Sequence, residues 1–192
     1  GDVVRTVAVN GTMACRWPKE KIISNEKIAL GDVIVGLASY GQSTYETAYN
    51  SGIGSNGLTS ARHDALSKFY AEHFTESFDN NLSPEVVYIG KNKLTDAVTG
   101  SQNSSSTIGQ LILSPTRTYA PVMKELLQHH FDKIHGLIHC SGGGQTKCMK
   151  YLPAPFKVIK DNLFEAPEIF KILQQNSGSS NKEMYEVFNM GC

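Results

Sequence analysis

Short apolar runs alternate with stretches of helical periodicity along the 192 residues of this chain. The run at residues 33–38 (Val-Ile-Val-Gly-Leu-Ala) is bounded by Gly31-Asp32 and by Ser39. A short continuous apolar run with such boundaries is typical of a strand buried on both faces. Runs of this kind predict strands at residues 3–9, 33–38, 86–89, 108–113, 134–139 and 156–159.

Apolar residues spaced three or four apart predict helices between these strands. The clearest helix begins after Gly57, with Ser55 or Asn56 as its N-cap. Its apolar positions are Leu58, Ala61, Ala65, Leu66, Phe69 and Phe74. Further helices are predicted at residues 119–131, 167–175 and 182–188, with a short helix-like segment at 145–151.

Strands and helices in alternation predict an α+β domain with α/β layers, in which one mixed β-sheet packs against helices. The chain is long enough for one sizeable hydrophobic core. Residues 99–107 (Thr-Gly-Ser-Gln-Asn-Ser-Ser-Ser-Thr) offer almost nothing to bury, so we expect them to be mobile.

Charge and composition narrow the class of protein. Eighteen Lys and Arg residues balance eighteen Asp and Glu residues, so no net field attracts nucleic acid or an anionic membrane. No apolar run approaches the ~20 residues that span a bilayer. We expect a soluble, cytoplasmic protein, a piece of a longer one at both ends, whose four cysteines are reduced thiols because no CxxC pair occurs.

Three glycine-rich motifs adjoin apolar runs, namely Ser51–Gly57, Ser141–Gly144 and Phe188–Gly191. Glycine lets backbone amides approach a ligand closely, and amides at a helix N-terminus favour an anion such as phosphate. Ser51–Gly57 is also good chemistry for an ordinary turn and cap, whereas three consecutive glycines rarely serve a plain connection. A phosphorylated ligand is therefore the leading hypothesis.

The segment Ser114-Pro-Thr-Arg-Thr-Tyr119 lies where a strand is predicted to meet a helix. Arg117 suits a bidentate contact to phosphate, and the alternative is a surface arginine beside a capping threonine. The candidate phosphate-binding residues are Ser51, Gly52, Ser55, Asn56, Gly57, Thr116, Arg117, Gly142, Gly143 and Gly144.

The sequence shows no pattern typical of a metal site or of a catalytic triad. The histidines at 129, 130, 135 and 139 match no standard zinc-ligand spacing, so we expect no metal site in this chain. No order of Ser, His and Asp, or of Cys and His, indicates a catalytic triad. The catalytic residues are therefore left unassigned.

Four stretches follow one another in the order of a known family. They are Gly31-Asp-Val-Ile-Val-Gly-Leu-Ala-Ser39 leading into Ser51–Gly57, Ser114–Tyr119, His135-Gly-Leu-Ile-His-Cys-Ser-Gly-Gly-Gly144, and Glu183-Met-Tyr-Glu-Val-Phe-Asn-Met-Gly191. As a set they resemble the C-terminal domain of phosphoribosylformylglycinamidine cyclo-ligase, also called aminoimidazole ribonucleotide synthetase. The family counterparts include a Ser-Gly-x-His-Ser-Asn-Gly loop and a Pro-Thr-Arg-Ile-Tyr segment.

The resemblance implies a cyclo-ligase C-terminal-like domain at residues 31–192, incomplete at its C-terminus, with residues 1–30 ending or linking a preceding domain. It implies an ATP-dependent ligase of de novo purine biosynthesis that converts formylglycinamidine ribonucleotide to aminoimidazole ribonucleotide. ATP and Mg²⁺ would be held mostly by an N-terminal half that this chain lacks. The full-length protein would be a homodimer, and this chain alone would be inactive.

The chain departs from the family at several places, and the segment around residues 75–107 looks longer than usual. Gly54 stands where the family has histidine, and Tyr40 to Asn50 looks inserted, which suggests a mobile flap over the ligand. Two alternative functions are compatible with these motifs. One is another ATP-using member of the superfamily, similar to selenophosphate synthetase or thiamine-phosphate kinase, and the other is a non-catalytic module that binds a phosphorylated ligand.

Overall fold

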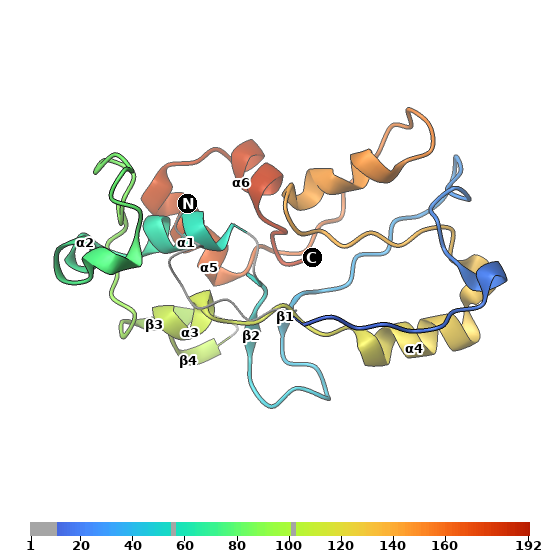
Figure 1. Ribbon diagram of the computed structural model, residues 1–192, viewed down its shortest axis with the longest axis horizontal. Helices are drawn as coiled ribbons and strands as arrows, with labels where there is room; N and C mark the ends of the chain where they lie inside the picture. The colour runs from blue at the N-terminus through green and yellow to red at the C-terminus, as the bar shows by residue number, and fades with distance from the viewer. Residues whose placement is uncertain (1–10, 55–56, 101–102) are drawn as a thin grey trace.

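Helices make up most of the regular structure, and several gather at one end of an elongated molecule (Figure 1). The computed structural model describes residues 11–54, 57–100 and 103–192. The α-helices are α1 (Leu58–Ala65), α2 (Phe69–His73), α3 (Ile108–Ile112), α4 (Ala120–His129), α5 (Glu168–Ser177) and α6 (Asn181–Val187). The 3₁₀ helices are η2 (Lys19–Lys21), η3 (Thr75–Ser77), η4 (Phe131–Lys133) and η5 (Gly144–Tyr151).

The strands form two separate antiparallel pairs. The strand β1 (Tyr40–Gly41) pairs with β2 (Asn50–Ser51), and Tyr40 lies opposite Ser51. The strand β3 (Ala97–Gly100) pairs with β4 (Asn103–Thr107), and Ala97 lies opposite Thr107. None of the helices in the described ranges is long and apolar enough to cross a membrane.

The hydrophobic core lies where α1, α3 and α5 meet, at the left of Figure 1. Its most buried side chains are Ile53, Ala61, Ala65, Val87, Tyr88, Ile108, Ile112, Ile169, Phe170, Leu173 and Met184. Full burial of a large aliphatic or aromatic side chain contributes about 1.5–3 kcal/mol. The ring of Phe170 lies 5.7 Å from that of Phe188, which extends the core to the segment after α6.

Local capping signals explain where several helices begin and end. Thr107 and Gln110 form a reciprocal capping box at the start of α3, and Ser180 and Glu183 form another at the start of α6. The helix α5 is capped at its C-terminus by Gly178, which is in the left-handed conformation that glycine adopts most readily.

Predictions for the helices are largely confirmed. The helices predicted at residues 119–131, 167–175 and 182–188 correspond to α4, α5 and α6, and the segment at 145–151 is η5. The helix after Gly57 is shorter than predicted, because α1 ends at Ala65 and Leu66 is extended. The segment predicted as a strand at 108–113 is helix α3, whose capping box the apolar pattern did not reveal.

The predicted mixed sheet is wrong for the described part of the chain, which holds only the two two-stranded antiparallel pairs. Residues 33–38, 86–89, 134–139 and 156–159 are not strands, and the strand predicted at 3–9 lies outside the described residues. A strand requires a neighbour for its backbone hydrogen bonds. Val33, Ile34 and Val35 are instead 88%, 56% and 79% exposed, and no backbone hydrogen bond joins residues 33–37 to any described residue.

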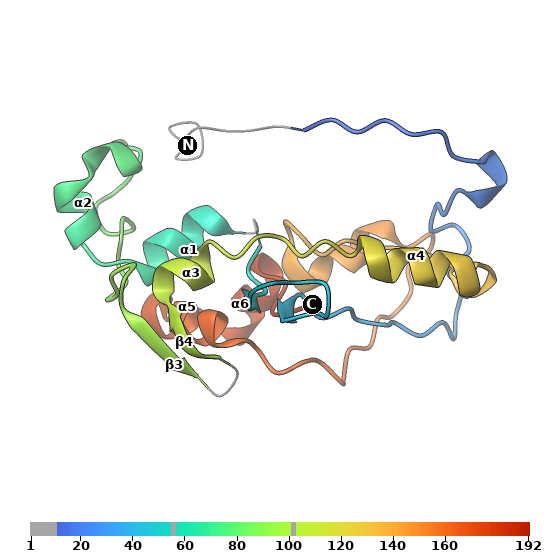
Figure 2. The same ribbon diagram turned by 90° about the horizontal axis from the view of Figure 1, so that it is seen from below.

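Two further segments complete the description of the chain. The low-complexity stretch at 99–107 supplies most of the β3–β4 hairpin, whose residues 101–102 lie outside the described ranges. Residues 11–18 are exposed throughout and run apart from the helices (Figure 2).

Candidate functional site

The three glycine-rich motifs meet at the segment that follows α6. The side-chain amide of Asn189 donates a hydrogen bond to the carbonyl oxygen of Gly52 (2.9 Å). Gln145 donates from its side chain to the carbonyl oxygen of Asn189 (2.5 Å), and the amide of Ser39 donates to the carbonyl oxygen of Gly191 (2.9 Å). We call this region the glycine junction; it comprises Ser39, Ser51–Gly54, Gly57, Gly144–Gln145 and Phe188–Gly191.

Two glycines permit the close packing of the glycine junction. A Cβ atom on Gly57 would lie 2.7 Å from the ring of Phe188, and φ is +58° there. A Cβ atom on Gly144 would lie 2.5 Å from the carbonyl oxygens of both Tyr185 and Phe188, and φ is +51°. The loops before α1 and before η5 therefore contact the same residue, Phe188, and any larger side chain would separate them.

Gly142 and Gly143, at the tip of the triple-glycine loop, have open space around them instead. A Cβ atom on Gly142 would meet nothing within 4 Å, and one on Gly143 would meet only Cβ of Lys147, at 3.9 Å. The amides of Gly142 and Gly143 donate no hydrogen bond to any described residue, whereas the amide of Gly144 donates to Ser141 (2.9 Å). The tip therefore presents two unpaired N–H groups.

Two lysines flank the triple-glycine loop, and the sequence patterns gave no reason to single them out. Lys147 Nζ donates to Ser141 Oγ (2.9 Å), and Lys160 Nζ donates to both the backbone and side-chain oxygens of Gln145 (2.7 Å each). Burial raises the pKa of the nearby Cys140 thiol, against the attraction of Lys160, so the thiol stays neutral. Two lysine ammonium groups therefore lie at this loop, one bonded to Ser141 and one to Gln145.

Ser51 is committed to the fold. Its hydroxyl donates to the carbonyl oxygen of Leu111 (2.6 Å), and its amide donates to Ser114 Oγ (3.1 Å). The amide of Gly52 donates to the side-chain oxygen of Asn50 (2.9 Å), so it is paired too. These bonds position the loop that leads into α1.

Arg117 uses all of its donors within the protein. A guanidinium has five N–H donors. Nε and one Nη donate to the two carboxylate oxygens of Glu46 (2.8 and 2.7 Å), and the remaining donors reach the carbonyl oxygens of Ala38 (2.8 Å), Tyr40 (2.9 Å) and Gly41 (2.9 Å). The predicted phosphate contact of Arg117 stays a prediction; in this conformation no donor is left for it.

The electrostatics of Arg117 and Glu46 agree with this geometry. Their side chains are 5% and 16% exposed. The hydrogen bonds from Arg117 lower the pKa of Glu46, and the same bonds raise the pKa of Arg117. Burial raises the pKa of the adjacent Tyr119 to about 12, so its hydroxyl keeps its proton and donates to Ala38 (3.3 Å). No sequence signal marked Glu46 as a partner, because it lies 71 residues away.

The remaining predicted residues lie close to the start of α1. Thr116 is exposed. A Cβ atom on Gly54 would lie 2.9 Å from Thr116 Oγ1. The structure thus brings Thr116 beside the position at which the family has histidine. Ser55 and Asn56, the two predicted ligands in this loop, lie outside the described residues.

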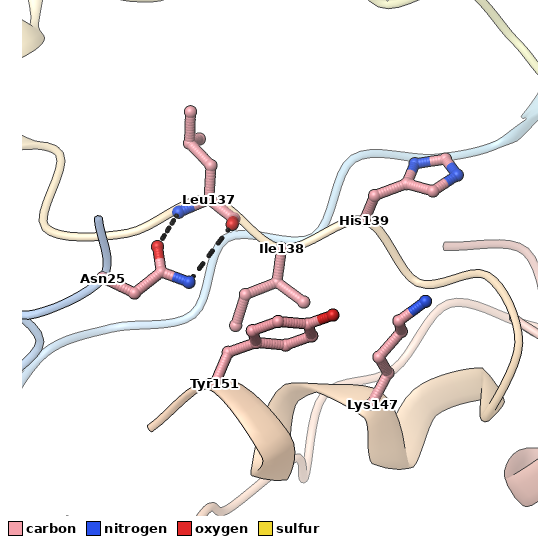
Figure 3. Close-up of a pocket in the computed structure, with 6 residues that line it drawn as sticks. All are labelled: Asn25, Leu137, Ile138, His139, Lys147 and Tyr151. Carbon is pink, nitrogen blue, oxygen red and sulfur yellow. Dashed lines mark hydrogen bonds between the residues drawn. The ribbon is translucent and has the colours of Figure 1, made fainter. Parts of the chain in front are cut away.

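A cavity of about 260 Å³ opens beside the triple-glycine loop (Figure 3). It is lined by Asn25, Leu137, Ile138, His139, Lys147 and Tyr151. The side-chain amide of Asn25 exchanges two hydrogen bonds with the backbone of Leu137, as a neighbouring strand would (2.9 and 3.4 Å; Figure 3). Lys147 borders both this cavity and the glycine tip.

Metal-ligating side chains are dispersed over the described ranges. No group of three or more His, Cys, Asp or Glu side chains within them could hold a metal ion. His135 pairs with the carboxylate of Asp32 (2.8 Å), which also accepts a hydrogen bond from the amide of Ala29. These contacts lower the pKa of Asp32, first through the bond from Ala29 and then through His135.

Comparison with known proteins shows sequence similarity to one family of enzymes. The chain is 35% identical over 172 residues to the phosphoribosylformylglycinamidine cyclo-ligase of Methanothermobacter thermautotrophicus, covering 90% of this chain and 40% of that protein. It is 31% identical over 175 residues to the cyclo-ligase of Pseudothermotoga lettingae (90% and 40%) and 29% identical over 190 residues to that of Methanosarcina barkeri (99% and 45%). No family model matches the chain.

The chain therefore spans less than half the length of these relatives, and the similarity extends over nearly all of its own residues. The resemblance predicted from the four motifs is confirmed. This chain is homologous to phosphoribosylformylglycinamidine cyclo-ligases.

Proposed function

We propose that this chain is the part of an ATP-dependent phosphoribosylformylglycinamidine cyclo-ligase that holds the phosphate of the ribonucleotide. The observation that supports it is the tip of the triple-glycine loop, where the amides of Gly142 and Gly143 donate to no described residue and a Cβ atom on either glycine would meet nothing closer than 3.9 Å. Unpaired amides beside a cation favour an oxyanion. Lys147 supplies that cation, four residues beyond Gly143.

A second group of contacts comes from the loop before α1. Gly57 packs against the ring of Phe188 and Gly144 against its carbonyl oxygen, so the two loops contact one residue. Thr116 offers an exposed hydroxyl beside Gly54. Ser51, Gly52 and Gly144 shape these loops through their own hydrogen bonds and packing, and their direct contact with phosphate stays a prediction.

The wider chemistry belongs to the whole protein. Similarity to cyclo-ligases supports closure of the imidazole ring of formylglycinamidine ribonucleotide, a step of purine biosynthesis. ATP and Mg²⁺ would be bound mostly by the part of the relatives' length that this chain does not span. The full-length protein would be a cytoplasmic homodimer, with its first domain boundary near residue 31.

A pair of glycine substitutions tests the proposal in the full-length protein. Gly142→Val puts a branched side chain over the two amides without straining a left-handed backbone, and Gly11→Val is the matched control because it too meets nothing within 4 Å. Calorimetric titration with formylglycinamidine ribonucleotide should show affinity reduced about tenfold or more for Gly142→Val, the equivalent of losing one charge-assisted hydrogen bond. Lys147→Ala should weaken binding similarly. Wild-type affinity in both variants would place the phosphate elsewhere.

A further inference from the structure

The segment from Tyr40 to Asn50 forms a tethered hairpin. Its base is the pair of strands β1 and β2. At its tip, the carboxylate of Glu46 accepts a hydrogen bond from the amide of Ser43 (2.7 Å) as well as those from Arg117. The hydroxyl of Tyr45 donates to the carbonyl oxygen of Thr118 (2.9 Å).

We propose that Arg117 is a positioning residue that clamps this hairpin through Glu46 and thereby sets the Ser51–Gly54 loop for ribonucleotide binding. The proposal rests on the proposed function. It assigns Arg117 a role different from direct contact with phosphate. It also assigns a role to Glu46, which lies in the stretch that looks inserted.

The clamp reaches the loop through one continuous stretch of chain. Residues 114–118 hold the hairpin at its tip through Arg117 and Thr118, and they hold its base through Ser114 and Pro115. Asn50 donates from its side chain to the carbonyl oxygen of Pro115 (2.8 Å), and the amide of Ser51 donates to Ser114 Oγ. The same stretch carries Thr116, which lies beside Gly54. A shift of the hairpin would therefore change the spacing between Gly54 and Thr116.

The chemistry of the clamp requires arginine. Five donors in one plane satisfy a carboxylate and three carbonyl oxygens, whereas the ammonium of lysine offers three donors at a single point. An exchange of the two charges should not restore the clamp. A carboxylate at position 117 would face the carbonyl oxygens of Ala38, Tyr40 and Gly41.

The test uses Glu46→Ala and Arg117→Lys in the full-length enzyme, with Lys171→Ala as a control that removes an exposed ion pair to Glu165. Both clamp variants should raise KM for the ribonucleotide about tenfold, with kcat within about twofold, because a displaced loop weakens binding without altering the reacting groups. The double variant should be no worse than either single one, since both break the same clamp. Amide exchange over residues 40–54 should increase in both variants and stay unchanged in Lys171→Ala.

The outcomes separate the two proposals. Faster amide exchange with an unchanged KM would show that the clamp is structural only, and it would overturn the positioning role. A fall in kcat alone would overturn it as well. If the wild-type protein binds no ribonucleotide in calorimetry, the proposed function fails and the positioning role fails with it. If Glu46→Ala does not fold, Glu46→Gln replaces it, because it keeps one acceptor oxygen and the shape of the side chain. The same changes in KM and in amide exchange are then expected.

Discussion

The glycine junction and the extended run at residues 33–37 carry similar sequence signals, yet they differ in how their polar groups are satisfied. In the junction, Asn189, Gln145 and Ser39 pair with backbone groups from distant parts of the chain. Across the described residues, no buried side-chain nitrogen or oxygen lacks a partner. Residues 33–37 make no backbone hydrogen bond to the described residues and expose three consecutive β-branched side chains.

Glycine loops and apolar runs differ in how much of their structural surroundings they specify. A glycine loop specifies a close approach locally, because any Cβ atom would block it. An apolar run specifies only that it should be covered, and the partner must come from elsewhere in sequence. This chain spans 40% to 45% of the length of its relatives.

Truncation at the two regions should have very different costs. Ile53 is fully buried within the glycine junction, so Ile53→Ala should lower the free energy of unfolding by about 2–5 kcal/mol. Val35→Ala is the matched control in the extended run and should change it by less than about 0.5 kcal/mol. Urea unfolding followed by circular dichroism measures both. Comparable losses in the two variants would show that residues 33–37 are buried in solution.

Two neighbouring glycines should also behave differently. Gly144→Ala forces a Cβ atom to within 2.5 Å of two carbonyl oxygens at positive φ, so it should destabilise the fold by about 2–4 kcal/mol. Gly142→Ala meets nothing and should be nearly neutral for stability. Thermal unfolding of the two variants provides the comparison. Equal melting temperatures would mean that the loop before η5 is not packed against Phe188.

The sequence predicted what depends on short-range signals and missed what depends on distant partners. The helices α4, α5 and α6 follow from the periodicity of apolar residues. The start of α6 is also marked in the sequence, because Ser180 and Glu183 form a capping box there. The strand at 108–113 was wrong because an apolar run of that length fits either structure, and only the capping box of Thr107 and Gln110 decides it.

In the candidate site, too, local features were predicted from the sequence and a contact with a distant partner was not. All three glycine motifs contribute to the glycine junction, and their shared contact with a phosphate stays a prediction. The commitment of Arg117 to Glu46 could not be read from sequence. The local sequence around an arginine does not show whether it binds a phosphate or pairs with a carboxylate 71 residues away.

The clamp should give the glycine junction an acid-sensitive component that the extended run lacks. The pKa of Glu46 is lower in the folded protein than its ordinary value of 4.5. Its contribution to stability is therefore complete above pH 4.5 and is lost as the pH falls through the lower folded-state value. Glu46→Gln should cost about 1.5–3 kcal/mol at neutral pH, and the difference from wild type should shrink below pH 4. Urea unfolding across pH 3–7 measures this; a constant difference would contradict it.

The smallest effect on stability is expected from polar substitution in the extended run, and it tests whether that run pairs with anything. An exposed, β-branched edge is a template for association between chains. Replacing Val33 and Val35 by threonine preserves branching at Cβ and lowers apolar exposure, so the free energy of unfolding should change by less than about 0.5 kcal/mol. Sedimentation at rising protein concentration should show less self-association than wild type. A loss of stability above about 1 kcal/mol would instead mean that a neighbouring strand covers residues 33–37 in solution, as the sequence pattern predicts for a buried strand.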